Sequence, residues 1–225
     1  MQSRFNSIRP FLIAATALAL WCAWMPSAET CGAQADWKAG IASVVITPQS
    51  PTPMAGAFSP VPRTEKIHDL HAKALALEDA KGTRLVIVAL DICMVPMELR
   101  QAMENEVARR FNLPPNGLLL NASHTHAGPE TRPNRVVLYG FPPEVVQQVE
   151  RYVAWLQGRL VEVIGAALED LRPATLSFSQ DQAPFACNRR LKTENGYQMA
   201  RNPDGRFDHD VPVLQVKGKD GKLRA

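Results

Sequence analysis

The segment 84–91 reads Arg-Leu-Val-Ile-Val-Ala-Leu-Asp, so that a continuous apolar run of strand length lies between a charged residue at each end. Such a run predicts a central strand that is covered on both faces. The segment 96–112 then predicts a helix, because an apolar residue recurs at every fourth position. These residues are Leu99, Met103, Val107 and Phe111. A second apolar run begins at Leu118, and the order strand, helix, strand predicts a layered α/β fold.

The remaining segments extend this pattern. Strands are predicted over 40–46, 72–78, 175–179 and 211–216, and a long helix over 142–171. The turn-forming residues 79–83 separate two of the strands, so 72–78 and 84–91 are expected to pair as a hairpin. Residues 218–222 predict another hairpin turn, and 223–225 begin a returning strand. Because the sequence stops within that strand, we expect the sequence to be truncated. The expected fold class is a mixed β-sheet layered with helices.

The first 35 residues predict a cleaved signal peptide. Arg4 and Arg9 precede an apolar run from 11 to 24, and Ala33-Gln34-Ala35 offers the small-x-small pattern of a cleavage site. The apolar run is shorter than the roughly 20 residues of a membrane-spanning helix. We therefore expect a secreted or periplasmic protein whose mature domain covers 36–225.

Charge and cysteine content narrow the function further. The net charge of +3 is weak and no cluster of Lys and Arg occurs, so nucleic acid is not an expected partner. Removal of the signal peptide leaves Cys93 and Cys187, which could form a disulfide or remain two separate thiols. The oligomeric state stays open.

The run Asn-Ala-Ser-His-Thr-His-Ala-Gly-Pro follows the apolar strand 118–122 and contains His124 and His126. In an extended chain, residues two apart point to the same face, so both imidazoles are expected to project together. They could give two nitrogens to one Zn²⁺, or one nitrogen to the metal and the other to the substrate. Alternatively, they could cap the strand end by hydrogen bonds. The sequence Gly128-Pro129 argues against the His-x-His-x-Asp-His pattern of metallo-β-lactamases.

Several other polar residues are candidates. Asp91 ends the first apolar run, where it could orient a metal-bound histidine or cap a loop. His68, His71 and His209 could complete a metal site, although surface or packing roles are the alternative. Arg189, which follows Asn188, could bind a carbonyl or hydroxyl group through its planar guanidinium group.

Across residues 38–225, the sequence resembles the neutral ceramidase family. Several segments carry the resemblance in the right order: Ala39-Gly40-Ile41-Ala42, Ile46-Thr47-Pro48, Met54-Ala55-Gly56, 67–75, 88–91, Ser123-His124-Thr125-His126-Ala127-Gly128-Pro129 and Asn188-Arg189. The His-Thr-His-(Ser/Ala)-Gly-Pro run is the most specific of them. Ala127 replaces the more usual serine.

The resemblance implies that a zinc-activated water hydrolyses the amide of N-acylsphingosine. This lipid substrate could be bound at a membrane surface. The resemblance implies that His124 is a zinc ligand, that His126 lies beside the metal and the substrate head, and that Arg189 contacts the substrate. It also implies further ligands beyond Ala225, so this chain is expected to hold part of a site in the N-terminal portion of a larger zinc hydrolase domain.

Three alternatives remain at this point. The chain could belong to a family member that hydrolyses a different N-acyl or ester substrate, or it could be an exported domain without catalytic activity. It could also contain a metal site of the carbonic anhydrase or amidohydrolase type, completed by His68, His71 or His209.

Overall fold

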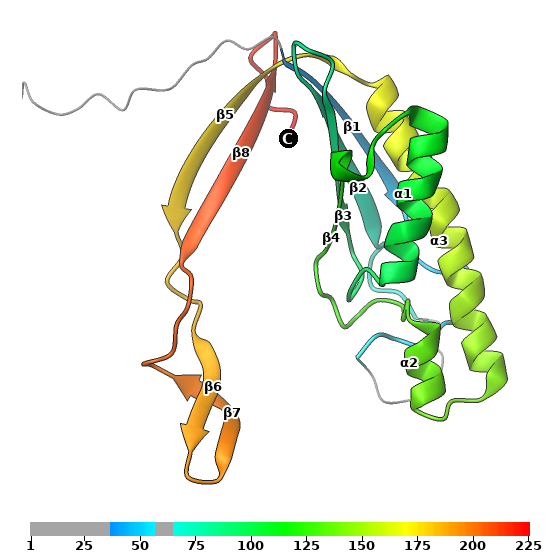
Figure 1. Ribbon diagram of the computed structural model, residues 1–225, viewed down its shortest axis with the longest axis vertical. Helices are drawn as coiled ribbons and strands as arrows, with labels where there is room; N and C mark the ends of the chain where they lie inside the picture. The colour runs from blue at the N-terminus through cyan, green and yellow to red at the C-terminus, as the bar shows by residue number, and fades with distance from the viewer. Residues whose placement is uncertain (1–36, 57–64) are drawn as a thin grey trace, which may run out of the picture. The chain divides into compact units, whose positions relative to one another are not determined.

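The computed structural model describes residues 37–56 and 65–225. The predicted signal peptide, residues 1–35, and part of the proline-rich segment before residue 64 lie outside the described residues. Figure 1 shows the elements in chain order. They are β1 (Trp37–Val45), β2 (His71–Glu78), β3 (Arg84–Leu90), α1 (Met97–Phe111), η2 (Pro115–Gly117), β4 (Leu118–Ala122), α2 (Pro133–Leu138), α3 (Pro143–Glu169), β5 (Arg172–Gln182), β6 (Asn188–Thr193), β7 (Gly196–Asn202) and β8 (Asp210–Gly218).

Six strands form one mixed sheet in the order β4-β3-β2-β1-β5-β8. Only β3 and β4 run parallel within it, and the other neighbouring pairs are antiparallel. The predicted hairpin is confirmed: β2 and β3 pair with Glu78 opposite Arg84. Its turn is closed by hydrogen bonds of Asp79 and by Gly82, whose φ of 80° is the left-handed conformation that glycine adopts easily. The predicted α/β class is confirmed.

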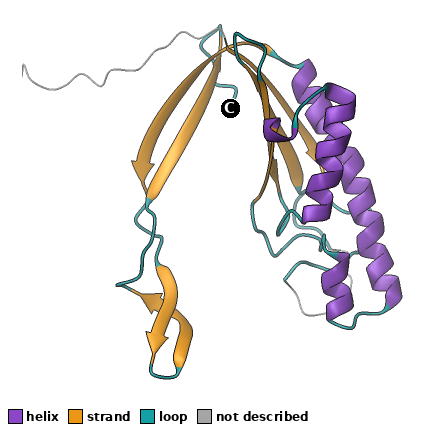
Figure 2. Cartoon of the chain, in the orientation of Figure 1, coloured by secondary structure: helices purple, strands orange, loops and turns teal. Residues whose placement is uncertain are grey.

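The helices lie on one face of the β1–β4 part of the sheet (Figure 2). The predicted apolar stripe of α3 is buried, including Tyr152, Leu156 and Leu160, and so is the stripe of α1. These side chains meet the inward residues of β3, where Val86 and Val88 are fully buried. Both helices therefore pack on the face of the sheet to which the inward side chains of β3 point.

The prediction that the 84–91 strand is covered on both faces is wrong for the described residues. Side chains alternate across a strand, so the residues between the buried ones point to the other face. Leu85 on β3 is 36% exposed and Leu119 on β4 is 51% exposed. The second face of this apolar run carries no helical layer in the described part of the chain.

The C-terminal strands differ from the prediction in extent. β5 and β8 are longer than the predicted segments, and the hairpin β6–β7 was not predicted, because its residues lack an apolar alternation. The predicted returning chain after β8 is confirmed by backbone hydrogen bonds between Val216 and both Arg224 and Ala225. Among the described residues, no helix has both the length and the apolarity that crossing a membrane requires.

Candidate metal centre

Two loops leave the sheet from the same edge because β3 and β4 are parallel. The first loop follows Leu90 and contains Cys93, and the second follows Ala122 and contains His124. The Ser123 N–H donates to the Leu90 carbonyl, so the loops begin side by side. The carboxyl ends of parallel strands are where open α/β sheets place their ligand sites. Cys93 and His124 meet at this edge.

His124 and His126 approach each other in this second loop, but not as neighbours on a strand. The predicted extended geometry is wrong: β4 ends at Ala122, and His124 has a φ of 59°. This left-handed conformation is uncommon for a residue with a side chain, and such outliers gather at functional sites. The turn brings the two Nε2 atoms to 3.4 Å from each other, with the ring centroids 5.0 Å apart.

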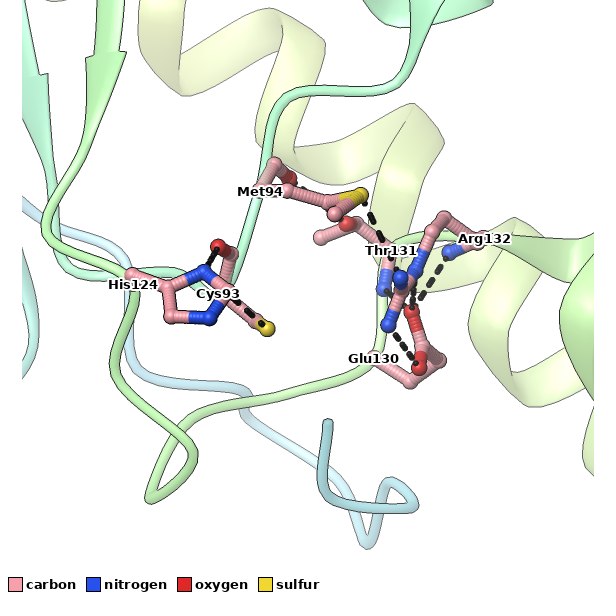
Figure 3. A network of polar contacts seen from close by, with 6 residues as sticks. All are labelled: Cys93, Met94, His124, Glu130, Thr131 and Arg132. Atoms are coloured by element: carbon pink, nitrogen blue, oxygen red, sulfur yellow. Dashed lines mark hydrogen bonds and ion pairs between the residues drawn. The ribbon is translucent and has the colours of Figure 1, made fainter. Parts of the chain in front are cut away.

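One hydrogen bond sets the orientation of the His124 ring. Its Nδ1 lies 2.8 Å from the carbonyl oxygen of Cys93 (Figure 3). Because a carbonyl oxygen only accepts, Nδ1 carries the hydrogen and the lone pair lies on Nε2, facing His126. Metal-binding histidines are commonly fixed by such a bond from the other ring nitrogen. The Cys93 carbonyl therefore fixes the orientation of the His124 ring.

The donor set fits a metal of the zinc type. Two nitrogens bound to a tetrahedral Zn²⁺ at about 2.0–2.1 Å lie about 3.3 Å from each other, close to the spacing of the two Nε2 atoms. Cys93, His124 and His126 each offer one ligand atom, and all three atoms lie within 4.8 Å of one another. Imidazole and thiolate donors suit zinc and similar cations.

No second cluster of three such residues occurs in the described ranges 37–56 and 65–225. The hypothesis that His68, His71 or His209 completes the group is therefore not supported there, since the third residue is Cys93. From the sequence, Cys93 was expected to be either a disulfide partner or a separate thiol. The signal for it was present, because Cys93 follows the end of β3 as His124 follows the end of β4. Cys93 is buried, Cys187 is exposed, and both are free thiols.

Gly56 forms one wall of the site. Its φ is +77°, and a Cβ placed on it would lie 2.3 Å from Nδ1 of His126, so the imidazole rests directly against the glycine backbone. The segment before Gly56 is bonded to the end of the histidine loop. The Ala55 N–H donates to the Gly128 carbonyl, and the Glu130 N–H donates to the Pro53 carbonyl. One side of the His126 ring thus lies against a segment far away in sequence, while the residue remains exposed.

A buried ion pair fixes the other end of the loop. Glu130 is 5% exposed and pairs with Arg132, with the Arg132 Nε 2.6 Å from a Glu130 oxygen. This hydrogen bond is the main reason that the pKa of Arg132 is raised. Thr131 Oγ1 donates to the Met94 carbonyl, and Arg132 also contacts the Met94 sulfur (Figure 3). The loop that carries Cys93 is therefore tied to the histidine loop.

The Asp91 carboxylate accepts a hydrogen bond from the backbone N–H of His71, at 2.9 Å. In return, the Asp91 N–H donates to the His71 carbonyl. This is the loop-capping alternative of the sequence analysis. The role of Asp91 toward a metal-bound histidine stays a prediction.

Arg189 lies on the exposed strand β6, at an irregularity in the β6–β7 register. Asn188 organises this segment: its side chain donates to the Arg206 carbonyl and accepts from the Arg190 N–H. His209 bonds the Ala186 carbonyl and stacks on Phe207. All these contacts stay within 182–210, so the described contacts do not bring Arg189 to the histidines.

A cavity of about 450 Å³ adjoins the histidine loop. Thr125, Ala127 and Gly128 contribute to its wall. The rest of the wall is mixed apolar and polar, and it comprises Thr47, Pro48, Thr52, Met54, Glu65, Lys66, Ile67, His68, Leu70 and Pro129.

No protein-family model matches the sequence, and no curated protein matches it. Solved ceramidase structures match the fold. Neutral ceramidase from Pseudomonas aeruginosa superposes with a TM-score of 0.64 at 22% identity, and a ceramidase complexed with C2 superposes with a TM-score of 0.62, also at 22% identity. The chain has the fold of part of a neutral ceramidase.

Each match covers 84% of this chain but 30% of the ceramidase chain, so this chain spans under a third of the length of the structures it resembles. At this identity the similarity concerns the fold. The predicted resemblance to ceramidases is confirmed at that level.

Proposed function

We propose that this chain carries part of the catalytic site of a zinc-dependent amide hydrolase of the ceramidase type, with His124 as a zinc ligand. The observation that carries the proposal is the 3.4 Å separation of the two Nε2 atoms, with Nδ1 of His124 already bonded to the Cys93 carbonyl. Its position at the carboxyl ends of two parallel strands and the ceramidase-like fold support it.

The residues would divide the work as follows. His124 presents its Nε2 lone pair to the metal, and the bonded Nδ1 keeps the ring from rotating. A bound zinc ion supplies Lewis-acid chemistry and lowers the pKa of a water molecule. His126, whose ring lies against Gly56, would exchange a proton or a hydrogen bond with the substrate head. Arg189 would donate to a substrate hydroxyl or carbonyl group from the β6–β7 hairpin.

The proposed substrate is a lipid amide of the N-acylsphingosine type, presented at a membrane surface. The adjoining cavity supports this choice, because Met54, Leu70 and Pro129 offer apolar surface close to the histidine loop. Thr52 and Thr125 lie in the same wall and can bond polar parts of a lipid head. An N-acyl or ester substrate of another kind is the close variant. Residues 1–35 would direct the protein to the periplasm or the exterior before cleavage.

The test uses the protein at its full natural length, purified with zinc. Metal content is measured by elemental analysis, and turnover by release of fatty acid from N-acylsphingosine and from a panel of other amides and esters. We expect His124→Ala to lose both metal and turnover. His126→Ala is expected to lower kcat by about 10²–10⁴-fold, the range for loss of a general acid or base.

His209→Gln is the matched control, because that imidazole bonds and stacks only within its own segment. It should keep metal and turnover. Full metal content and activity in His124→Ala would refute the assignment. A wild-type protein that binds zinc but cleaves no member of the panel would leave the non-catalytic exported domain as the better description.

A further inference from the structure

The β6–β7 hairpin carries more positive charge than the proposed hydrolase site uses (Figure 1). Residues 188–202 contain a single acid, Glu194, against four cations, which gives a net charge of +3. The cations are Arg189, Arg190, Lys192 and Arg201. The whole chain also has a net charge of +3, so the rest of it is neutral on balance. The charge imbalance of the chain is therefore concentrated in this hairpin.

The pairing of the two strands gathers two of these cations with two large side chains. Lys192 lies opposite Tyr197, and Arg190 lies opposite Met199. Side chains opposite each other in an antiparallel pair point to the same face, and so do residues two apart on one strand. The four side chains therefore share one face of the hairpin, which we call the basic face. All four are exposed, Tyr197 to 70% and Met199 to 81%, whereas Leu191 on the other face is partly buried.

The cations of the hairpin are not neutralised within the molecule. In the described ranges 37–56 and 65–225, none of the four forms an ion pair. Arginines on α1 differ, since Arg100 pairs with Glu104 and Arg109 pairs with Glu106. A cation without a carboxylate beside it keeps its full attraction for an external anion. The hairpin therefore offers its charge to a partner.

We infer that the basic face docks on an anionic lipid surface, from which the lipid amide is taken. The inference rests on the proposed function and adds the element that meets the lipid. Lysine and arginine attract anionic headgroups, while tyrosine and long apolar side chains occupy the boundary between headgroups and acyl chains. Arg189, the proposed substrate contact, precedes Arg190 on β6, so the basic face adjoins the residue that would bind the substrate.

A nucleic acid backbone is the other polyanion that cations beside an aromatic ring attract. The basic face favours lipid because of Met199, whose exposed side chain is apolar and has no ring on which a base could stack. Burial of such a side chain among acyl chains is favourable, whereas a phosphate backbone offers it no apolar surface. The combination of charge and an apolar anchor fits a lipid surface best.

Sedimentation of the full-length protein with vesicles tests the docking without any measurement of turnover. The vesicles contain phosphatidylcholine alone or an equal mixture of phosphatidylcholine and phosphatidylglycerol. We expect the wild type to bind the mixed vesicles about tenfold more tightly or better, and to lose this preference at high salt, which screens exposed charges. Arg190→Ala combined with Lys192→Ala should weaken that binding by about 10–30-fold, at roughly fivefold for each charge. Tyr197→Ala combined with Met199→Ala should weaken binding to both kinds of vesicle.

Arg109→Ala combined with Arg110→Ala is the matched control, because it removes the same charge from α1, where both arginines pair with Glu106. It should bind vesicles as the wild type does, and circular dichroism checks that each variant is folded. Equal binding of the wild type to both kinds of vesicle, or an equal loss in the control, overturns the docking. So does tighter binding to a single-stranded oligonucleotide than to the mixed vesicles.

Hydrolysis of a water-soluble, short-chain N-acyl amide separates this inference from the proposed function. A wild type that cleaves the soluble amide but shows no preference for the mixed vesicles retains the hydrolase and overturns the docking. A wild type that binds the mixed vesicles through the basic face but cleaves no amide retains the docking and overturns the hydrolase.

Discussion

The two ends of the main sheet are built on different principles. Strands β1–β4 rest on α1 and α3, and their inward side chains, such as Val86 and Val88, are fully buried. Strands β5 and β8 continue the sheet through a long antiparallel ladder, yet Phe178 is 68% exposed and Leu214 is 41% exposed. This end of the sheet buries only a small cluster, in which Ala174 of β5 and Val216 of β8 pack with residues of β1 and β2. The histidine pair follows β4 in the packed part of the sheet, whereas Arg189 belongs to the exposed β6–β7 hairpin, which connects β5 to β8.

The largest expected effect compares one leucine from each end. Leu156 on α3 is fully buried, and Leu214 on β8 is 41% exposed. We expect Leu156→Ala to lower the free energy of unfolding by about 2–5 kcal/mol, through lost burial and the cavity left behind. Leu214→Ala should cost less than about 1 kcal/mol. Urea unfolding of both variants measures the difference. Equal losses would show that β8 is packed as firmly as the helices.

The packed end was the part that the sequence could predict. The stripe of α3 and the hairpin β2–β3 follow from apolar periodicity and turn residues, and both are as expected. The hairpin β6–β7 could not be predicted, because Leu191 is the one apolar residue of β6 and no apolar alternation results. The exposed second face of β3 could not be predicted either. An apolar run indicates that burial of both faces is favourable, but it does not show whether this chain supplies a layer for each face.

The site was predictable in its residues but not in its geometry. His124 and His126 meet as expected, yet through a left-handed turn rather than along a strand. A turn of this kind depends on contacts from distant segments, here the Cys93 carbonyl and the backbone of Gly56. The carbonyl belongs to the backbone, which every residue has, so the sequence does not single it out, and Asp91 could be named only as one candidate, with the capping of a loop as its alternative role.

The next largest effect is expected from two glycines, one beside the histidine pair and one in the β2–β3 turn. Gly56 and Gly82 have nearly equal positive φ values, +77° and +80°, but a Cβ would collide with His126 only at Gly56. Each change to alanine costs roughly 1 kcal/mol of backbone strain. Gly56→Ala should cost about 1–3 kcal/mol more, as overpacking does, and it should weaken metal binding by displacing His126.

Thermal unfolding and metal titration of the two alanine variants separate these contributions. The Gly82→Ala variant reports the strain alone, because nothing lies within 4 Å of its Cβ position. If the two variants lose the same stability and bind metal equally, the contact between Gly56 and His126 does not constrain the site.

The smallest effect concerns two tyrosines and depends on pH. Tyr152 is buried and donates to the Ile46 carbonyl, and burial raises the pKa of its phenol well above the ordinary value of 10.0. Tyr197 on β7 is 70% exposed. At neutral pH, Tyr152→Phe should cost about 1 kcal/mol for the lost hydrogen bond. Tyr197→Phe should be neutral within about 0.5 kcal/mol.

Above pH 10 the comparison should change in a defined direction. A phenol whose pKa is raised in the folded state stabilises the fold fully below the unfolded pKa, and this contribution is lost as the pH rises above 10.0. The wild type should therefore lose stability up to about 1.4 kcal/mol per pH unit faster than Tyr152→Phe, which cannot ionise. Urea unfolding of the wild type and both variants at neutral and alkaline pH measures the two slopes. Parallel slopes for the wild type and Tyr152→Phe would mean that the phenol ionises as easily in the folded protein as in the unfolded chain, and that the packed end does not exclude solvent at Tyr152.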